Sequence, residues 1–175
     1  LCNASPAGDM SPPLLVLGAS VELACWRNDA VHTRRVPLER FFLGPGKTVR
    51  LPQELLTAVV FERHAAGFVG RFRKAGPRPP LEISTVSVAL GARFADGRLR
   101  DVRVAMGSVA PTPLRARHVE AALEGQPLNA ATLAAAVEAA AEDAKPIDDV
   151  RASAWYRGHL VRVFVEEVLN DVRRD

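Results

Sequence analysis

The hydrophobic pattern changes its period near Pro113, and this change constrains the fold more than any other feature of the sequence. Before it, apolar residues alternate with other residues in two runs, residues 83–94 and 99–109. Asp96 and Gly97 lie between the runs, and this pair tolerates the positive φ angles of a tight turn. After Pro113, the apolar residues recur at helical spacing. The pattern therefore predicts an antiparallel hairpin followed by helices.

Three helices are expected after the hairpin. The first covers residues 114–123 and ends at Gly125, since glycine commonly terminates helices. The second covers the alanine-rich residues 129–144, with Asn129 as its N-terminal cap. Pro146 prevents that helix from continuing, because proline lacks the N–H that the helix requires.

The third and longest helix is expected over residues 151–174. Asp148 and Asp149 precede it, where a carboxylate can cap a helix and interacts favourably with its dipole. Six apolar residues are expected to form a stripe along its buried face: Trp155, Leu160, Val163, Phe164, Val168 and Leu169. The second half is therefore predicted to be an α+β unit, a small antiparallel sheet packed with three helices.

A boundary is expected at residues 74–80, KAGPRPP, which hold three prolines and a glycine. Such a segment does not fit inside a helix or a central strand. We expect residues 1–76 to belong to one domain and residues 77–175 to form a second.

Short mixed elements are expected in the first half. Residues 14–17 and 21–25 are predicted to be strands around a turn. Pro37 suits the first turn of a short helix. Residues 55–61, LLTAVVF, are predicted to form a buried strand or helix, because the run is apolar and flanked by polar residues.

The composition is that of an ordinary globular chain, with 48% hydrophobic and 25% charged residues among 175. No apolar run approaches the roughly 20 residues of a membrane helix, and no basic leader is visible, so neither a membrane span nor an export signal is expected. The net charge is +3, but the arginines are dispersed and aromatics are 6%, which argues against nucleic-acid binding. Cys2 and Cys25 are too few for a metal site or a disulfide framework. We expect two buried free thiols in a reducing cytoplasm.

The residues alone indicate neither a hydrolytic nor a metal site. Residues 44–48, GPGKT, suggest a phosphate loop, but that loop requires a glycine where Phe41 stands, so a plain glycine-rich turn is expected. The four histidines are isolated and show no metal-ligand spacing. Residues 1–9, LCNASPAGD, have mostly small side chains, so a polyhydroxylated or phosphorylated ligand can approach their backbone amides. An ordinary turn is the alternative for this segment.

Six ordered segments, which run nearly from end to end, carry a resemblance to a known family. They are LCNASPAGD at residues 1–9, RRVPLERFFLGPGKT at 34–48, PQELLTAVV at 52–60, FRKAGPRPPLEISTVSVA at 72–89, GSVAPTPLRA at 107–116 and PIDDVRASAWYRGHLV at 146–161. Together they resemble the C-terminal portion of the FAD-binding (medium) subunit of molybdenum hydroxylases, the xanthine dehydrogenase and carbon monoxide dehydrogenase group. The resemblance implies that residues 1–76 are the second part of a mixed α/β FAD-binding domain. Residues 77–175 would then be the carbon monoxide dehydrogenase flavoprotein-like C-terminal domain.

The resemblance also implies four cofactor-binding residues. Asp9 matches an aspartate that hydrogen-bonds FAD, and Asn3 lies at a polar position near the phosphate and ribityl portion. Leu56 matches an apolar residue that packs against the isoalloxazine ring, and Lys74 matches a lysine near the flavin. These residue types fit, because a carboxylate accepts hydroxyl protons, an aliphatic side chain excludes water and a cation favours reduced flavin. The alternatives are a solvated aspartate, a core leucine and a surface lysine.

The implied function is that of an FAD-dependent oxidoreductase subunit in an electron relay. Electrons would pass from iron–sulfur clusters to FAD and then to NAD⁺ or another acceptor. The chain has neither the cysteine sets for 2Fe–2S clusters nor a molybdenum site, so an iron–sulfur subunit and a molybdopterin-binding large subunit are expected as partners.

Two further functions are considered. The family's two FAD-clamping loops, the second of T-I-G-G-N type, would lie before Leu1. The chain alone is therefore also consistent with a non-catalytic module that docks to partners without holding FAD. A cell-wall flavin reductase is the weaker alternative, because the segments after Ile83 do not resemble it.

Overall fold

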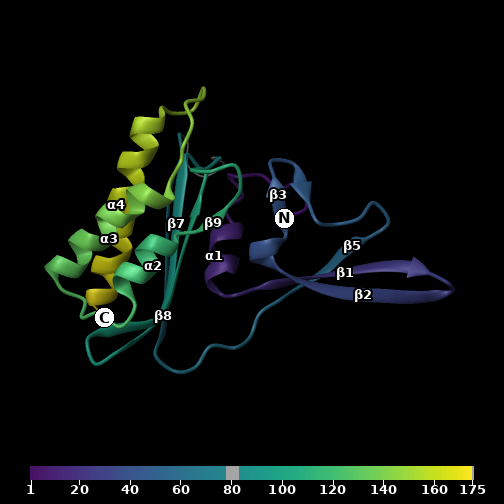
Figure 1. Ribbon diagram of the computed structural model, residues 1–175, viewed down its shortest axis with the longest axis horizontal. Coiled ribbons are helices and arrows are strands. Elements are labelled where there is room, and N and C mark those ends of the chain that lie inside the picture. Colours follow the sequence, from purple (N-terminus) through teal and green to yellow (C-terminus); the bar gives the residue numbers. More distant parts are fainter. Residues whose placement is uncertain (78–82, 175) are drawn as a thin grey trace.

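The computed structural model of the chain describes residues 1–77 and 83–174. At its centre lies a four-stranded antiparallel sheet in the order β6 (Phe68–Ala75), β7 (Val86–Ala95), β8 (Arg98–Gly107) and β9 (Leu114–Arg115). One face is covered by three helices (Figure 1): α2 (Arg117–Leu123), α3 (Ala130–Asp143) and α4 (Ala154–Arg173). Helix α1 (Ser11–Val16) packs on β7 and β8 with the other N-terminal segments. The predicted α+β class, an antiparallel sheet packed with three helices, is confirmed.

The predicted hairpin is confirmed as β7 and β8. Asp96 and Gly97 form its turn with φ angles of 51° and 69°, the left-handed values expected of this pair. The first strand begins at Val86, later than predicted, and Ile83 is 61% exposed. β6 adds a strand that the alternation did not predict, and it pairs with β7 along its whole length. Of the proline-rich boundary, residues 78–80 lie outside the described residues, and the division of the chain there stays a prediction.

A β-bulge interrupts the pairing of β7 and β8. The register shifts between Gly91 and Arg93, and Asp101 on the opposite strand has a φ of 53°. After the bulge, Val102 belongs to the core beneath the helices, whereas the Arg103 guanidinium lies on the side of α1, 3.5 Å from a backbone oxygen there. After the extra residue of the bulge, the side chains of β8 alternate between the two faces of the sheet.

Glu120 of α2 and Glu124, which follows this helix, satisfy backbone donors along the edge of β8. Glu124 accepts hydrogen bonds from the N–H groups of Asp101 and Val102, at 3.1 and 2.8 Å. Glu120 accepts one from the N–H of Val104 at 2.9 Å. These carboxylates take the place of a neighbouring strand, since β9 pairs with β8 only at its far end.

The helix predicted from residue 114 needs a correction. Leu114 belongs to β9 and pairs with Met106, and the helix begins only at Arg117.

The second and third predicted helices are confirmed as α3 and α4. The Asn129 side chain accepts a hydrogen bond from the N–H of Thr132 at 3.0 Å, so it caps α3 as predicted. α4 begins at Ala154 rather than at residue 151. Ser153 caps it by accepting a hydrogen bond from the N–H of Tyr156 at 3.2 Å.

The predicted apolar stripe of α4 needs a correction at its start. Trp155 is 77% exposed, whereas Arg157 is 1% exposed. The buried residues of this helix share one face: Arg157, Val161, Phe164, Val165, Val168, Leu169 and Val172. Trp155 precedes this series by two positions, which places it about 200° around the helix. Its large apolar side chain suggested burial, but the helical period decides the face.

The strand predicted over residues 14–17 is wrong, because these residues lie in helix α1 and the turn that follows it. Pro12 and Pro13 stand in the first turn, where the proline ring presets a helical φ. The apolar residues of α1 belong to a buried cluster with two small residues of the central sheet, Ala89 and Ala105. A short apolar run cannot distinguish strand from helix, and the two prolines decide here.

A second sheet, in the order β2-β1-β5, extends away from α1 (Figure 1). Its strands are β1 (Ser20–Arg27), β2 (Ala30–Pro37) and β5 (Leu55–Val60). β1 confirms the strand predicted over residues 21–25, and the helix expected after Pro37 is the 3-10 turn η1 (Leu38–Arg40). β5 is a strand but not a buried one: Leu55 is 71% exposed, whereas the next residue, Leu56, packs against the N-terminal cluster.

The GPGKT motif is a plain turn, as predicted. Gly46 has a φ of 71° between β3 (Phe42–Gly44) and β4 (Lys47–Thr48), which pair with each other.

Both cysteines are free, but the expectation that they are buried is wrong. Cys2 is exposed, and Cys25 is partly exposed on the β1–β2 hairpin, where no helix covers it.

Candidate functional site

Asp9 and Lys74, two of the predicted cofactor residues, form an ion pair. The ammonium nitrogen of Lys74 lies 2.7 Å from Oδ2 of Asp9. The hydroxyl of Ser84 donates a hydrogen bond to the other carboxylate oxygen, Oδ1, at 2.5 Å. The carboxylate is therefore held on both oxygens by groups that lie 65 and 75 residues away in the sequence.

Strand pairing brings these three residues together. Lys74 lies near the end of β6, opposite Ser87 of β7. Ser84 precedes β7, and next to it the N–H of Thr85 donates a hydrogen bond to the carbonyl of Ala75 at 2.7 Å. The ends of β6 and β7 are thereby fixed side by side, and the N-terminal loop places Asp9 over them.

The contacts of Asp9 favour the charged form of its carboxyl group. Partial burial works to raise the pKa of Asp9, but hydrogen bonds from Lys74 and Ser84, together with the Lys74 charge, lower it below its usual value. The Asp9 side chain is 39% exposed and that of Lys74 is 27% exposed. The pair therefore offers a carboxylate and an ammonium group that a ligand can still reach.

Backbone hydrogen bonds fix the loop of residues 1–9 against the central sheet. The Pro6 carbonyl accepts a hydrogen bond from the N–H of Ser108 at 2.8 Å, and the Ala4 carbonyl accepts one from the N–H of Gly46 at 3.3 Å. Ala4 is 1% exposed, so the loop is part of the packed structure. Asp9 therefore projects from a defined backbone and not from a free end.

Gly107 permits this close approach of the loop. A Cβ at this position would lie 2.5 Å from Oγ of Ser87 and 3.2 Å from Cγ of Pro12. Real side chains do not tolerate the first of these distances, so a larger residue would displace Ser87 or the loop. Gly107 is therefore favoured because there is no room for a side chain between Ser87 and Pro12.

A cavity of about 270 Å³ opens beside the same loop. Ser5, Pro6 and Ala7 line it together with Pro45, residues that precede β9 and α4, and Arg157 of α4. The loop predicted to admit a ligand therefore borders a hollow that is mostly apolar.

A buried arginine, Arg157, ties α4 to the strand ends beside this cavity. Its guanidinium donates hydrogen bonds to the carbonyls of Thr85 and Ser108, at 2.5 and 3.0 Å, and to Oδ1 of Asp149 at 2.7 Å. Both carbonyls belong to the chain segments that hold Asp9 and its loop. Sequence reasoning missed Arg157, because an arginine in an amphipathic helix ordinarily lies on the exposed face.

The two aspartates before α4 have different roles. Asp148 accepts a hydrogen bond from the N–H of Ala154 at 2.6 Å and so caps the helix as predicted. Asp149 instead pairs with Arg151 and Arg157. Hydrogen bonds from the Arg151 side chain and backbone, and from Arg157, hold the pKa of Asp149 well below its usual value. Its carboxylate therefore stays charged and orients the buried arginine.

The other two predicted site residues lie apart from this cluster. Asn3 is exposed in the turn that joins Leu1 to Ala4. Leu56 is half-buried in β5, opposite Leu23, and packs against the N-terminal core. Over residues 1–77 and 83–174, no described hydrogen bond or ion pair joins either of them to Asp9 or Lys74. Ser84, in contrast, carried no signal in the sequence, because a lone serine before a strand fits any surface turn.

Two absences complete the description of residues 1–77 and 83–174. No group of three or more His, Cys, Asp or Glu side chains there is arranged to hold a metal ion. No helix in this part of the chain is both long and apolar enough to span a membrane.

Two protein-family models together match most of the chain. Residues 71–172 match the CO dehydrogenase flavoprotein C-terminal domain, and residues 1–61 match the FAD binding domain in molybdopterin dehydrogenase. The first match begins within β6 and extends through the rest of the central sheet and the three helices to residue 172. The second includes the loop with Asp9 and the β2-β1-β5 sheet.

Individual relatives agree with these matches. The xanthine dehydrogenase FAD-binding subunit of Escherichia coli O157:H7 is 33% identical over 98% of this chain and 58% of the relative. The glyceraldehyde dehydrogenase medium chain of Sulfolobus acidocaldarius is 29% identical over 98% of this chain and 59% of the relative. Among solved structures, carbon monoxide dehydrogenase from Hydrogenophaga pseudoflava superimposes with a TM-score of 0.89 at 29% identity, over 97% of this chain and 57% of that one. This chain thus spans less than two thirds of the length of these relatives, and it belongs to the family of FAD-binding subunits of molybdopterin dehydrogenases.

Proposed function

We propose that the chain is the C-terminal part of an FAD-binding electron-transfer subunit, in which Asp9 and Lys74 contact the flavin. The ion pair between these two residues carries the proposal. Each was expected at the cofactor separately, from segments 65 residues apart, and the fold brings them to 2.7 Å. An ordinary ion pair on the surface has no buried partner. Here Ser84 is fully buried and donates a hydrogen bond to the same carboxylate.

The side chains present fit this cofactor. FAD, when bound, supplies a ring that takes up electrons and gains negative charge. The Lys74 ammonium would stabilise that added charge, and its hydrogen bond to Asp9 keeps it from turning away. The free lone pairs of the Asp9 carboxylate accept hydroxyl protons, which is the role expected toward a ribityl chain or ring N–H. Burial of Ser84 fixes the direction in which the carboxylate points.

Asn3 and Leu56 complete the proposed site. Asn3 is exposed at the start of the loop, so its amide is available to the phosphate and ribityl portion of a ligand. Leu56 is half-buried and retains apolar surface for packing against the isoalloxazine ring. Both assignments rest on the resemblance of their segments to the family.

In the proposed relay, electrons reach FAD from the iron–sulfur clusters of a partner subunit and leave to NAD⁺ or another acceptor. A molybdopterin-binding large subunit would oxidise the substrate. Support comes from the relatives, which include FAD-binding subunits and medium chains of dehydrogenases. We further propose a cytoplasmic location, where free cysteines such as Cys2 and Cys25 stay reduced.

Replacing each of the two charged residues by alanine tests the proposal, in a subunit extended to the length of its relatives. Lys74→Ala is expected to lower the flavin midpoint potential by about 20–60 mV. The substitution removes a charge contact of about 1–3 kcal/mol that stabilises the reduced flavin. Asp9→Ala is expected mainly to weaken FAD retention, since its contacts do not depend on the redox state. Redox titration and the flavin-to-protein ratio are the measurements. An unchanged potential in Lys74→Ala, equal to that of the exposed control Lys47→Ala, would remove Lys74 from the site.

The length of the chain favours a second candidate, a docking module that does not hold FAD tightly. The chain covers 58% of the xanthine dehydrogenase FAD-binding subunit, so backbone donors elsewhere in such a subunit could hold the pyrophosphate. The 175-residue chain is then expected to purify without stoichiometric flavin, whereas the longer subunit is yellow. Visible flavin absorbance at one FAD per 175-residue chain would refute this second candidate.

A further inference from the structure

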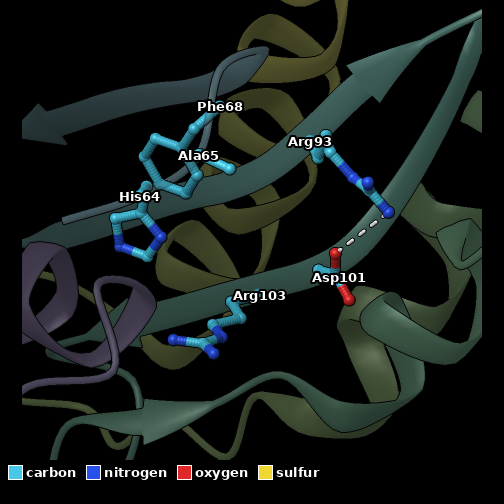
Figure 2. A pocket seen from close by; sticks show the side chains of 6 residues that line it. All are labelled: His64, Ala65, Phe68, Arg93, Asp101 and Arg103. Atoms are coloured by element: carbon cyan, nitrogen blue, oxygen red, sulfur yellow. Dashed lines mark ion pairs between the residues drawn. The ribbon is translucent and has the colours of Figure 1, made fainter. Parts of the chain in front are cut away.

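A cavity of about 160 Å³ lies on the α1 side of the central sheet, where β6 begins (Figure 2). It is lined by His64, Ala65, Phe68, Arg93, Asp101 and Arg103. A neighbouring cavity of about 390 Å³ shares His64, Ala65 and Arg103. The two hollows therefore form one concave region, with His64 and Arg103 between them.

This region is distant from the proposed flavin site. Phe68 and Lys74 are six residues apart on β6, which corresponds to about 20 Å along an extended strand. A ligand bound at Phe68 would not touch Asp9 or Lys74. The two sites can therefore be tested independently.

Positive charge dominates the lining of the two hollows. Four arginines, residues 35, 63, 93 and 103, face two carboxylates, Asp101 and Glu62. Arg93 lies 3.4 Å from Asp101, an exposed and loose pair. Across the described part of the chain, Arg63 makes no hydrogen bond or ion pair. The lining thus carries an excess of two positive charges before any proton on His64 is counted.

Arg103 is a half-buried donor that the protein itself satisfies only weakly. Its described hydrogen bond goes to the Val16 carbonyl, at 3.5 Å, the upper limit for such a bond. Its guanidinium occupies the space over Gly18, where a Cβ would lie only 2.2 Å from Nη1. A glycine in the left-handed region, with a φ of 66°, thus leaves room for a half-buried arginine that has donors to spare.

His64 adds an independent indication. Its Nε2 atom is buried and has no hydrogen-bond partner. Its ring stacks on Phe68, with centroids 3.9 Å apart and planes 12° from parallel, which fixes where the nitrogen lies. Figure 2 shows the ring and the Arg103 side chain bordering the same hollow from different segments. Buried polar atoms are rarely left unpaired, so a ligand atom is expected between them.

We propose that this region binds a phosphoryl group. A guanidinium presents paired N–H donors that match two oxygens of a phosphoryl group, and an imidazole N–H supplies a third. The larger hollow falls within the range of about 300–1,000 Å³ that small-molecule sites occupy. The same chemistry serves inorganic phosphate or the phosphate of a nucleotide.

Binding of inorganic phosphate and of ADP to the 175-residue chain tests the proposal, by phosphorus NMR and calorimetry. Arg103→Gln is expected to raise the dissociation constant roughly tenfold to hundredfold, because a charged hydrogen-bond donor is lost. Arg103→Lys keeps the charge but loses the paired donors, and an intermediate loss is expected. Arg173→Gln is the matched control: Arg173 is exposed near the end of α4, and removing its charge should leave binding unchanged.

The outcomes separate as follows. Equal affinity for phosphate and ADP identifies a site for the free ion, and tighter binding of ADP identifies a nucleotide site. Both support a phosphoryl site if Arg103→Gln weakens them. The proposal is overturned if neither probe saturates below about 10 mM, or if Arg173→Gln loses as much affinity as Arg103→Gln. Should Arg103→Gln not fold, Arg93→Gln and His64→Leu take its place, and unchanged binding in both would equally overturn the proposal.

Discussion

Val88, Leu90 and Val104 of the central sheet belong to the core beneath the three helices, whereas Ala89 and Ala105 of the same strands belong to the cluster with α1. Large side chains on the helix side are held by apolar burial, which contributes about 25 cal/mol per Å² and does not depend on pH. Small side chains on the other side let the N-terminal segments approach the backbone closely. The N-terminal segments form a second buried apolar cluster there, with Leu23, Leu38 and Phe41, and polar contacts at its border hold Asp9 and Arg103.

The difference teaches where this molecule can bind ligands. A side held by apolar packing tolerates little displacement, because each lost methylene group leaves a cavity. The N-terminal side is also packed, but ion pairs and backbone hydrogen bonds at its border offer charged groups that a ligand can share. Asp9, Lys74 and Arg103 are such groups, and all three lie on the side of α1 or its loop.

The largest expected effect is on the helix side. Leu169→Ala should lower the free energy of unfolding by about 2–5 kcal/mol, since Leu169 is fully buried and its loss leaves a cavity. Leu55→Ala, at a residue that is 71% exposed, should cost less than about 0.5 kcal/mol. Urea denaturation of both variants is the measurement. Equal losses would break the distinction between a packed side and an open one.

An intermediate effect is expected from acid on the N-terminal side. Glu54 is 4% exposed and accepts two hydrogen bonds from Arg34, at 2.6 and 2.8 Å. These bonds lower the pKa of Glu54 from 4.5 to about 2, against the opposing effect of its burial. A carboxylate whose folded pKa is lowered stabilises the fold above its unfolded pKa, and that contribution disappears as the pH falls through the folded pKa. We expect roughly 2–3 kcal/mol to be lost between about pH 5 and pH 2.

The Glu54→Gln variant identifies the source of this pH dependence. It should be less stable than the original chain at pH 7 and nearly equal to it at pH 2. Amide hydrogen exchange should show the β2-β1-β5 sheet opening in acid before β7 and β8. If all strands open together, or if the variant keeps the full pH dependence, Glu54 is not the cause.

The smallest effect is expected at Gly107. Gly107→Ala should cost about 1–3 kcal/mol, because the new methyl group would meet Ser87 and Pro12. Protection of the Ser108 amide, which is bonded to Pro6, should fall with it. Gly44→Ala is the control, since a Cβ there meets nothing within 4 Å. Full protection of Ser108 in Gly107→Ala would show that the loop adapts without cost.

Local signals in the sequence were sufficient for the parts of the fold that depend on local structure. The hairpin at Asp96 and Gly97 and the cap at Asn129 each follow from a few adjacent residues, and both are confirmed. β9 depends on pairing with a strand several residues earlier, so helical spacing from residue 114 was misleading. β6 was not expected, because its partner β7 lies on the other side of the proline-rich segment in the sequence.

The candidate site shows the same limit. Asp9 and Lys74 were predicted because whole segments around them resemble a family, not because either residue has a periodic pattern. Ser84 and Arg157 also lie in such segments, but neither was singled out, because their importance depends on partners 75 and 72 residues away, respectively. A single sequence gives no account of those pairings, since they arise only when β6, β7 and α4 come together.

The carboxylates of Glu120 and Glu124 along β8 have a consequence for the association of copies of this chain. A strand with unpaired N–H groups is a template on which a strand from another molecule can add, and repeated addition leads to aggregates. Here the donors of Asp101, Val102 and Val104 are already occupied, so they are not available to the carbonyl oxygens of an approaching strand. Helix α2 therefore acts as a guard against sheet extension as well as part of the core. A chain that loses these two glutamates would retain most of its apolar packing and yet become prone to growth from this edge.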